Sequence, residues 1–337
     1  MVSFFKGKTP SGVFRLIILS VAVHFSFFIA PPKVAVSPQD YLLHGLLSPI
    51  AGMPAVFIAV IYHVLIIVQA LRINYLICNY RMFLNMNYTP AMCYVIFSAL
   101  TPAWGNVSAA LVANIMVALL IDMLMKLYYS QHPARSVFDC GLVAGLCVLV
   151  FPPACILILL MLIAVLILRP IRLNEIFSYF IGVTLPYYFL GGWLFLTGKL
   201  PLMKNYLPKI EWHFSLLNLN NKVYLLIAGA AVLFCVLLGF LFMQDRMARL
   251  VIAARKQWII FTLSFLFLAI SIPFVKNDDW IMALFVAMPA ASAIAANVFY
   301  YAKPKALIAV LFWLLIIACI FNNFNGMSLL NALLPKL

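Results

Sequence analysis

Hydrophobic positions in this chain form long uninterrupted blocks, separated by short stretches that hold the charged residues, glycines and prolines. A helix needs roughly 20 apolar residues to cross a bilayer, and eleven blocks approach that length. The pattern predicts an all-α fold: a polytopic transmembrane bundle of about eleven spans in one integral membrane domain, residues 1–337. The expected spans are 13–30, 54–72, 89–103, 106–126, 136–151, 153–169, 176–197, 223–243, 257–275, 280–301 and 305–322.

Composition and charge support a membrane protein and exclude two other classes. Only 9% of the residues are charged, whereas a soluble globule carries about a quarter. The net charge of +14 comes from lysines and arginines that stand singly or in pairs between apolar blocks, so we expect no nucleic-acid partner. With the N-terminus in the cytoplasm, fifteen of these cations fall on the cytoplasmic side and seven outside. This bias predicts a cytoplasmic N-terminus and a C-terminus on the outer face.

Two pairs of expected spans are separated by almost no loop. Residues 89–103 and 106–126 meet at a Pro-Ala corner, as do residues 136–151 and 153–169. Because proline cannot continue a helix, each corner predicts a tight helical hairpin. A 15-residue helix covers only about 22 Å of a hydrocarbon core of about 30 Å. The short hairpins are therefore either ordinary spans in a bundle or the walls of a recessed cavity that opens outward.

The two longer outer loops hold candidate chemistry. Helical spacing of apolar residues in the first, 31–53, predicts a helix lying in the membrane interface. Asp40 begins this helix and His44 follows on the same face, so Asp40 could act as a general base toward an acceptor hydroxyl. Three lysines of the second outer loop could neutralise a lipid-linked phosphate: Lys199, Lys204 and Lys209. The alternative is that Asp40 caps the helix and that the lysines contact anionic membrane lipids.

The other acids divide between the two faces. Asp278 and Asp279 stand together at an outer span mouth, where their oxygens could hold a divalent cation or cap a helix. Asp122 precedes Lys126 by one helical turn and predicts an ion pair near the cytoplasmic surface. No charged residue falls at a span centre, which disfavours an ion-coupled pump. Only His24, His63 and Asn114 approach that depth, and packing is the simpler role for them.

Stretches rich in glycine, proline and aromatic residues carry a resemblance. They are Met1–Lys6, Phe138–Leu142, Phe151–Pro153, Leu168–Glu175, Gly182–Tyr188 and Pro289. In these stretches the chain resembles an uncharacterised family of multi-span inner-membrane proteins found chiefly in the Bacteroidota. The resemblance implies a multi-pass protein of the bacterial inner membrane whose C-terminus is periplasmic, and it implies no activity.

A second resemblance is architectural. An early outer acid on an interfacial helix, followed by paired short hairpins, is similar to membrane glycosyltransferases of the GT-C type, which use polyprenyl-phosphate sugars. This resemblance implies a glycosyltransferase at the periplasmic face, with Asp40 as base. Two alternatives stay open. One is a non-catalytic scaffold or subunit of a cell-envelope complex, which meets a protein partner through Gly141 and Gly145 or through Ala291–Ala296. The other is a facilitator of neutral or lipidic solutes.

Overall fold

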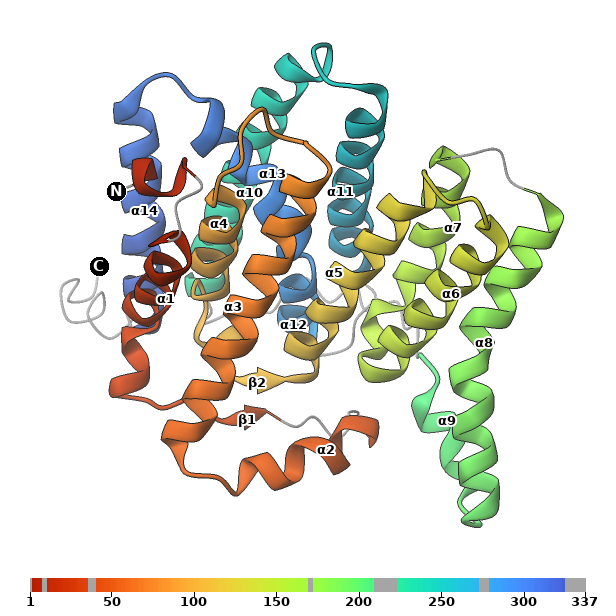
Figure 1. Ribbon diagram of the computed structural model, residues 1–337. Coiled ribbons are helices and arrows are strands. Elements are labelled where there is room, and N and C mark those ends of the chain that lie inside the picture. Colours follow the sequence, from red (N-terminus) through yellow and green to blue (C-terminus); the bar gives the residue numbers. More distant parts are fainter. Residues whose placement is uncertain are drawn as a thin grey trace.

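The computed structural model describes residues 2–7, 11–35, 41–168, 172–208, 223–272 and 279–324, and helices dominate it (Figure 1). The first half contains α1 (Ser11–Val23), α2 (Tyr41–Ala51), α3 (Ala55–Asn79), α4 (Thr89–Ser98), α5 (Ala109–Leu127), α6 (Pro133–Val150) and α7 (Ile156–Leu168). The second half contains α8 (Leu173–Leu196), α9 (Met203–Tyr206), α10 (Val223–Met247), α11 (Ile252–Ser271), α12 (Asp279–Val286), α13 (Met288–Tyr301) and α14 (Lys305–Asn323). Short 3₁₀ turns connect them at Val2–Phe5, Phe25–Phe28, Pro102–Gly105, Pro152–Cys155 and Leu200–Leu202.

Each predicted block contains a helix, but the prediction of about eleven spans is not confirmed. In the described part of the chain, seven helices are long and apolar enough to cross a membrane: α3, α5, α6, α8, α10, α11 and α14. An eighth span results if α12 and α13, which meet at a bend of 53°, are counted together. The remaining apolar helices, α1, α4 and α7, are shorter. Such a set of apolar helices is typical of a membrane-spanning protein.

Only the second predicted hairpin forms as expected. Helices α6 and α7 turn at Pro152–Cys155 and pack on each other. After Ser98, in contrast, the chain leaves α4 through an extended connection, so that α4 packs mainly on α3 and α13 while α5 packs on α6 and α12. A two-residue parallel ladder anchors that connection, since β1 (Val34–Ala35) pairs with β2 (Val107–Ser108). The Pro-Ala corner at 102–103 begins a 3₁₀ turn four residues after α4 has ended, and it makes no hairpin.

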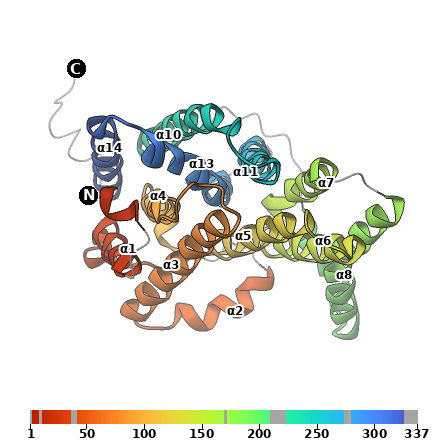
Figure 2. The ribbon, with the colours of Figure 1, turned by 45° about the horizontal axis from the view of Figure 1, so that its top comes forward.

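The predicted helix in the first outer loop is confirmed as α2, which crosses one end of the bundle (Figure 1). Asp40, which the sequence places at the start of this helix, lies outside the described residues. The interior consists of α4, whose ten residues are all buried, and α13, where twelve of fourteen are buried. Figure 2 shows these two helices enclosed by longer ones, with α6, α7 and α8 to one side.

The spans run in alternate directions, with α12 and α13 taken together as one bent span, so the loops divide between two ends. The loops after α3, α5, α7, α10 and α13 share the end that we call the basic end, and α2 and α9 lie at the opposite end (Figure 1). Of the described cations, three belong to the opposite end: Lys33, Lys199 and Lys204. Thirteen belong to the basic end: Lys6, Arg15, Arg72, Arg81, Lys126, Arg135, Arg172, Arg246, Arg249, Arg255, Lys256, Lys303 and Lys305. The charge asymmetry predicted from the sequence is thus present in the fold.

Glycines bring α6 and α8 into backbone contact. A Cβ atom on Gly141 of α6 would lie 2.4 Å from the Tyr179 carbonyl oxygen, and one on Gly182 of α8 would lie 2.4 Å from that of Phe138. A Cβ atom on Gly145 would lie 2.5 Å from the Val183 carbonyl oxygen. Helices approach this closely only where Cβ atoms are absent. The Gly141/Gly145 motif is therefore used inside the chain, and so it does not support the predicted contact with a partner protein.

Candidate functional site

Three polar side chains meet in the apolar core between α3, α4 and α5. Gln69 donates through Nε2 to the Leu111 carbonyl at 2.7 Å and accepts, through Oε1, a bond from the Tyr94 hydroxyl. Asn114 donates through Nδ2 to the Tyr94 oxygen at 3.3 Å. All three side chains are buried, and in such surroundings an unpaired polar group is costly. The helices are thus joined at their centre by a specific polar network.

The same network reaches the break between α12 and α13. Pro289 has no N–H, and therefore the Phe285 carbonyl, four residues earlier, loses its helical donor. Asn114 supplies the missing bond, since its Nδ2 lies 3.3 Å from that oxygen. The Oδ1 atom of Asn114 is buried and has no hydrogen-bond partner. The bend of 53° thus has a sequence cause and leaves one unpaired acceptor beside it.

We expect Asn114→Ala to destabilise the fold by about 1.5 kcal/mol. The variant leaves the Phe285 carbonyl without a donor, and this cost is partly offset because the buried, unsatisfied Oδ1 of Asn114 is removed as well. Adding Pro289→Ala should recover part of the loss, since alanine restores the N–H that the carbonyl needs. Thermal unfolding of the detergent-solubilised variants measures both effects, and Asn85→Ala, an exposed asparagine in a loop, is the control. A double variant that is no more stable than Asn114→Ala contradicts this account.

A second polar group links α1 to α3 nearer the opposite end. His24 Nδ1 lies 2.9 Å from the Ser20 carbonyl, which can only accept, so a neutral His24 is protonated there and accepts at Nε2 from the Tyr62 hydroxyl at 3.1 Å. Ser20 Oγ also bonds to His63 Nδ1 at 2.9 Å, and the two imidazole rings are 5.4 Å apart. The two histidines that the sequence presents as isolated packing residues therefore belong to one cluster.

Helix α4 ends inside the bundle at Ser98, and α14 supplies donors for the two backbone carbonyls that follow it. Asn322 Nδ2 lies 2.7 Å from the Leu100 oxygen, and Asn323 Nδ2 lies 2.6 Å from the Ala99 oxygen. Carbonyls in such an irregular segment have no helical donor, and in an apolar interior they require one from elsewhere. A helix that stops short in the core, beside a bent one, leaves irregular backbone inside the bundle.

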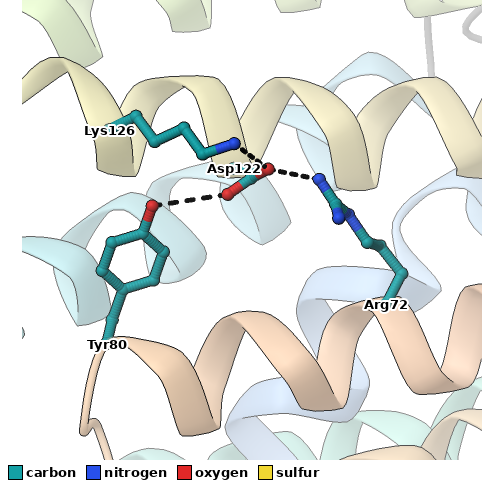
Figure 3. A network of polar contacts seen from close by, with 4 residues as sticks. All are labelled: Arg72, Tyr80, Asp122 and Lys126. Carbon is teal, nitrogen blue, oxygen red and sulfur yellow. Dashed lines mark hydrogen bonds and ion pairs between the residues drawn. The ribbon is translucent and has the colours of Figure 1, made fainter.

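Near the basic end, one buried carboxylate collects three donors (Figure 3). Asp122 of α5 accepts from Arg72 of α3, from Lys126 at 2.9 Å and from Tyr80 at 3.3 Å. Burial, reinforced by the charge of Asp122, raises the pKa of Tyr80 well above its usual range, so this phenol stays protonated and donates. The predicted Asp122–Lys126 pair is confirmed. The arginine, which comes from a distant part of the sequence, was not predicted.

A crevice of about 460 Å³ between α3 and α5 connects the charged cluster to the core network. Its lining is Val68, Gln69, Leu71, Arg72 and Tyr75 of α3 with Ile115, Ala118 and Leu119 of α5. Val68 and Tyr75 are exposed, so the crevice opens on the outer surface of the bundle. Arg72 belongs to both the crevice and the charged cluster, and Gln69 to both the crevice and the core. The buried Nε of Arg72 has no partner.

Comparison with known proteins places the chain in a family. A model described as a family of unknown function, DUF6427, matches residues 42–330. The chain belongs to this family. No curated protein and no solved structure matches it. Membership in DUF6427 agrees with the resemblance to an uncharacterised family and assigns no activity.

The predicted outer-face residues of this DUF6427 protein are only partly described. Lys199 and Lys204 lie at the opposite end, around the turn from α8 to α9, and His44 lies on α2. Asp279 begins α12, and the side chains of His44 and Asp279 are outside the described part. Asp40, Lys209 and Asp278 are outside it altogether. The base, phosphate-binding and cation roles of these residues stay predictions.

The polar core network of this DUF6427 protein was not predicted from the sequence, although a signal was present. Tyr62 and Gln69 are seven residues apart on α3 and share a helical face, with Arg72 close to that face one turn later. Polar residues at this spacing in an apolar helix point to the interior of a bundle. Among the described residues, no group of three or more His, Cys, Asp or Glu could hold a metal ion.

Proposed function

We propose that this protein transports an anionic lipid, which enters through the crevice between α3 and α5. One observation carries the proposal: an apolar, outward-opening crevice has an arginine in its wall and a polar core network at its base. The apolar lining suits hydrocarbon chains, and the guanidinium suits a phosphate or carboxylate headgroup. This function develops one of the alternatives that the sequence left open, a facilitator of neutral or lipidic solutes.

The charges around Asp122 favour an anionic occupant. Arg72 and Lys126 share the single carboxylate, so the cluster carries one surplus positive charge. An unbalanced charge within a membrane span is costly, even though Lys126 is largely exposed and can reach water. A headgroup phosphate beside Arg72 offsets that charge. By the positive-inside rule the basic end is cytoplasmic, so the lipid enters from the cytoplasmic leaflet.

The route away from the crevice follows the polar core. Gln69 is hydrogen-bonded to Tyr94, which in turn is hydrogen-bonded to Asn114. Asn114 lies beside the bend between α12 and α13, and Tyr94 lies one turn before the end of α4. Transport proteins place polar substrate groups at such discontinuous helices near the membrane midplane. The Tyr62–His24 cluster continues toward the opposite end. Rearrangement of the short helices α4 and α12 would carry the headgroup past this network.

Arg72→Gln is expected to reduce the transport rate of a fluorescent phosphatidylglycerol at least tenfold, because one charge-assisted contact to the headgroup is lost. The assay uses proteoliposomes and chemical quenching of the outer leaflet. Asp122 keeps Lys126 and Tyr80 as donors in this variant, so the fold should persist. Arg249→Gln, an exposed arginine of the same end, is the control and should transport at the wild-type rate.

The proposal fails if wild-type protein does not accelerate translocation over empty liposomes, or if Arg72→Gln transports as fast as Arg249→Gln. The glycosyltransferase hypothesis gains no support from the described residues or from the family. The two motifs that the scaffold hypothesis assigned to a protein partner are occupied inside the chain. Gly141 and Gly145 pack on α8, and the alanine-rich α13 packs on α10 and α4.

A further inference from the structure

A second pocket, of about 610 Å³, lies at the basic end where α6 and α8 begin. In contrast to the crevice, six of its eight lining residues have polar or charged side chains: Gln131, His132, Arg135, Arg172, Asn174 and Glu175. Its volume is within the range of roughly 300 to 1,000 Å³ that small-molecule sites occupy. The pocket and the crevice share no residue, so they are separate sites.

Glu175 makes this pocket chemically unusual. Glu175 is only 2% exposed, and its Oε2 atom is buried without a hydrogen-bond partner. Buried carboxylate oxygens are normally satisfied, and the positive end of the α8 dipole compensates only part of the charge. The sequence suggests a helix-capping role for Glu175, which accounts for its position in the first turn of α8 but not for an unpaired oxygen. The pocket thus contains a hydrogen-bond acceptor that lacks a donor.

Two arginines surround this acid without neutralising it. Arg135 and Arg172 are exposed in the pocket wall, and neither forms an ion pair within the described part of the chain. The spacing of Arg135 and Asp139 predicts a helical pair between them, but their side chains do not meet. The pocket therefore presents two cationic groups, both suited to a phosphate, beside one anionic acceptor.

The walls of the pocket are held in place by the close packing of α6 against α8. Ser178 of α8 donates to the Ala134 carbonyl of α6 at 2.9 Å, directly beneath the pocket lining. One turn further, Gly182 allows α8 to pack on the backbone of α6 at Phe138. Preformed walls lower the ordering cost of binding, so a ligand need not assemble the site.

We propose that this pocket binds a phosphoethanolamine group, either as the headgroup of a membrane lipid or as a free phosphate ester. The phosphate pairs with Arg135 and Arg172, and the primary ammonium donates to Glu175. A choline group carries no N–H and cannot satisfy the carboxylate, whereas a glycerol group carries no positive charge. The inference is independent of lipid transport through the crevice, because it rests on different residues.

The test compares the purified full-length chain with phosphatidylethanolamine, phosphatidylcholine and phosphatidylglycerol by native mass spectrometry. We expect wild-type protein to retain phosphatidylethanolamine about tenfold better than phosphatidylcholine, and Glu175→Gln to abolish that preference. Arg135→Gln/Arg172→Gln should weaken retention of both lipids while leaving their ratio unchanged. Lys303→Gln, an exposed cation of the same end outside the pocket, is the control.

A wild-type protein without preference for the ethanolamine headgroup would overturn the proposal, as would an unchanged preference in Glu175→Gln. If Glu175→Gln fails to fold, the double arginine variant still decides, since equal retention by it and by Lys303→Gln overturns the proposal. Competition with free phosphoethanolamine separates the two sources. Displacement of the lipid indicates that the soluble ester suffices, and retention indicates that the acyl chains are part of the ligand.

Discussion

Gly182→Ala is expected to destabilise the protein by about 3 kcal/mol, at the upper end of the cost of overpacking a core. The added Cβ would stand 2.4 Å from the Phe138 carbonyl and 3.0 Å from the Leu142 nitrogen, and both are backbone atoms of α6. Backbone cannot rotate away as a side chain can, so the two helices must separate. Separation also breaks the close contacts at Gly141 and Gly145.

The control for this prediction is in the same helix. Gly191 and Gly192 of α8 have open space where a Cβ would stand. Gly191→Ala should therefore be neutral or stabilise the helix by up to about 1 kcal/mol through helix propensity. Thermal unfolding in a fixed detergent compares the two variants. Equal unfolding temperatures for Gly182→Ala and Gly191→Ala would show that the glycines do not set the α6–α8 distance.

The sequence predicted the all-α class and the position of each helical block, because hydrophobic blocks depend only on local residue order. The number of spans could not be predicted in the same way. The hydrophobic block runs from residue 89 to 103, yet α4 ends at Ser98, and the carbonyls of Ala99 and Leu100 find donors on Asn322 and Asn323 more than 200 residues away. A tertiary contact of this kind leaves no mark on the local hydrophobic pattern.

The candidate site was predicted only where its parts are close in sequence. Asp122 and Lys126 are one turn apart, and their pair was expected. Arg72 was assigned to the cytoplasmic surface by its charge, and Gln69 received no role. Their meeting with Asp122 and Tyr94 depends on the packing of α3 against α4 and α5, which periodicity does not specify.

The second large effect is expected at Asp122. Asp122→Ala should cost about 3 kcal/mol, because Arg72 and Lys126 then repel each other and the guanidinium lies partly buried beside an apolar crevice. This figure is at the lower end for a broken buried ion pair, since solvent reaches 34% of the arginine side chain and 65% of the lysine. Asp245→Asn, an exposed acid of the same end, should change stability little.

A double-mutant cycle separates the two roles of Arg72. If its main role is structural, Arg72→Gln/Asp122→Asn should be more stable than Asp122→Asn, because the unpaired charge is removed with its partner. The double variant should still fail to transport phosphatidylglycerol, since the crevice then lacks a cation for the headgroup. Recovered stability without recovered transport would assign the arginine a function beyond the ion pair. If the double variant recovered both stability and transport, Arg72 would serve only to neutralise Asp122. The proposal that the crevice binds an anionic ligand would then be wrong.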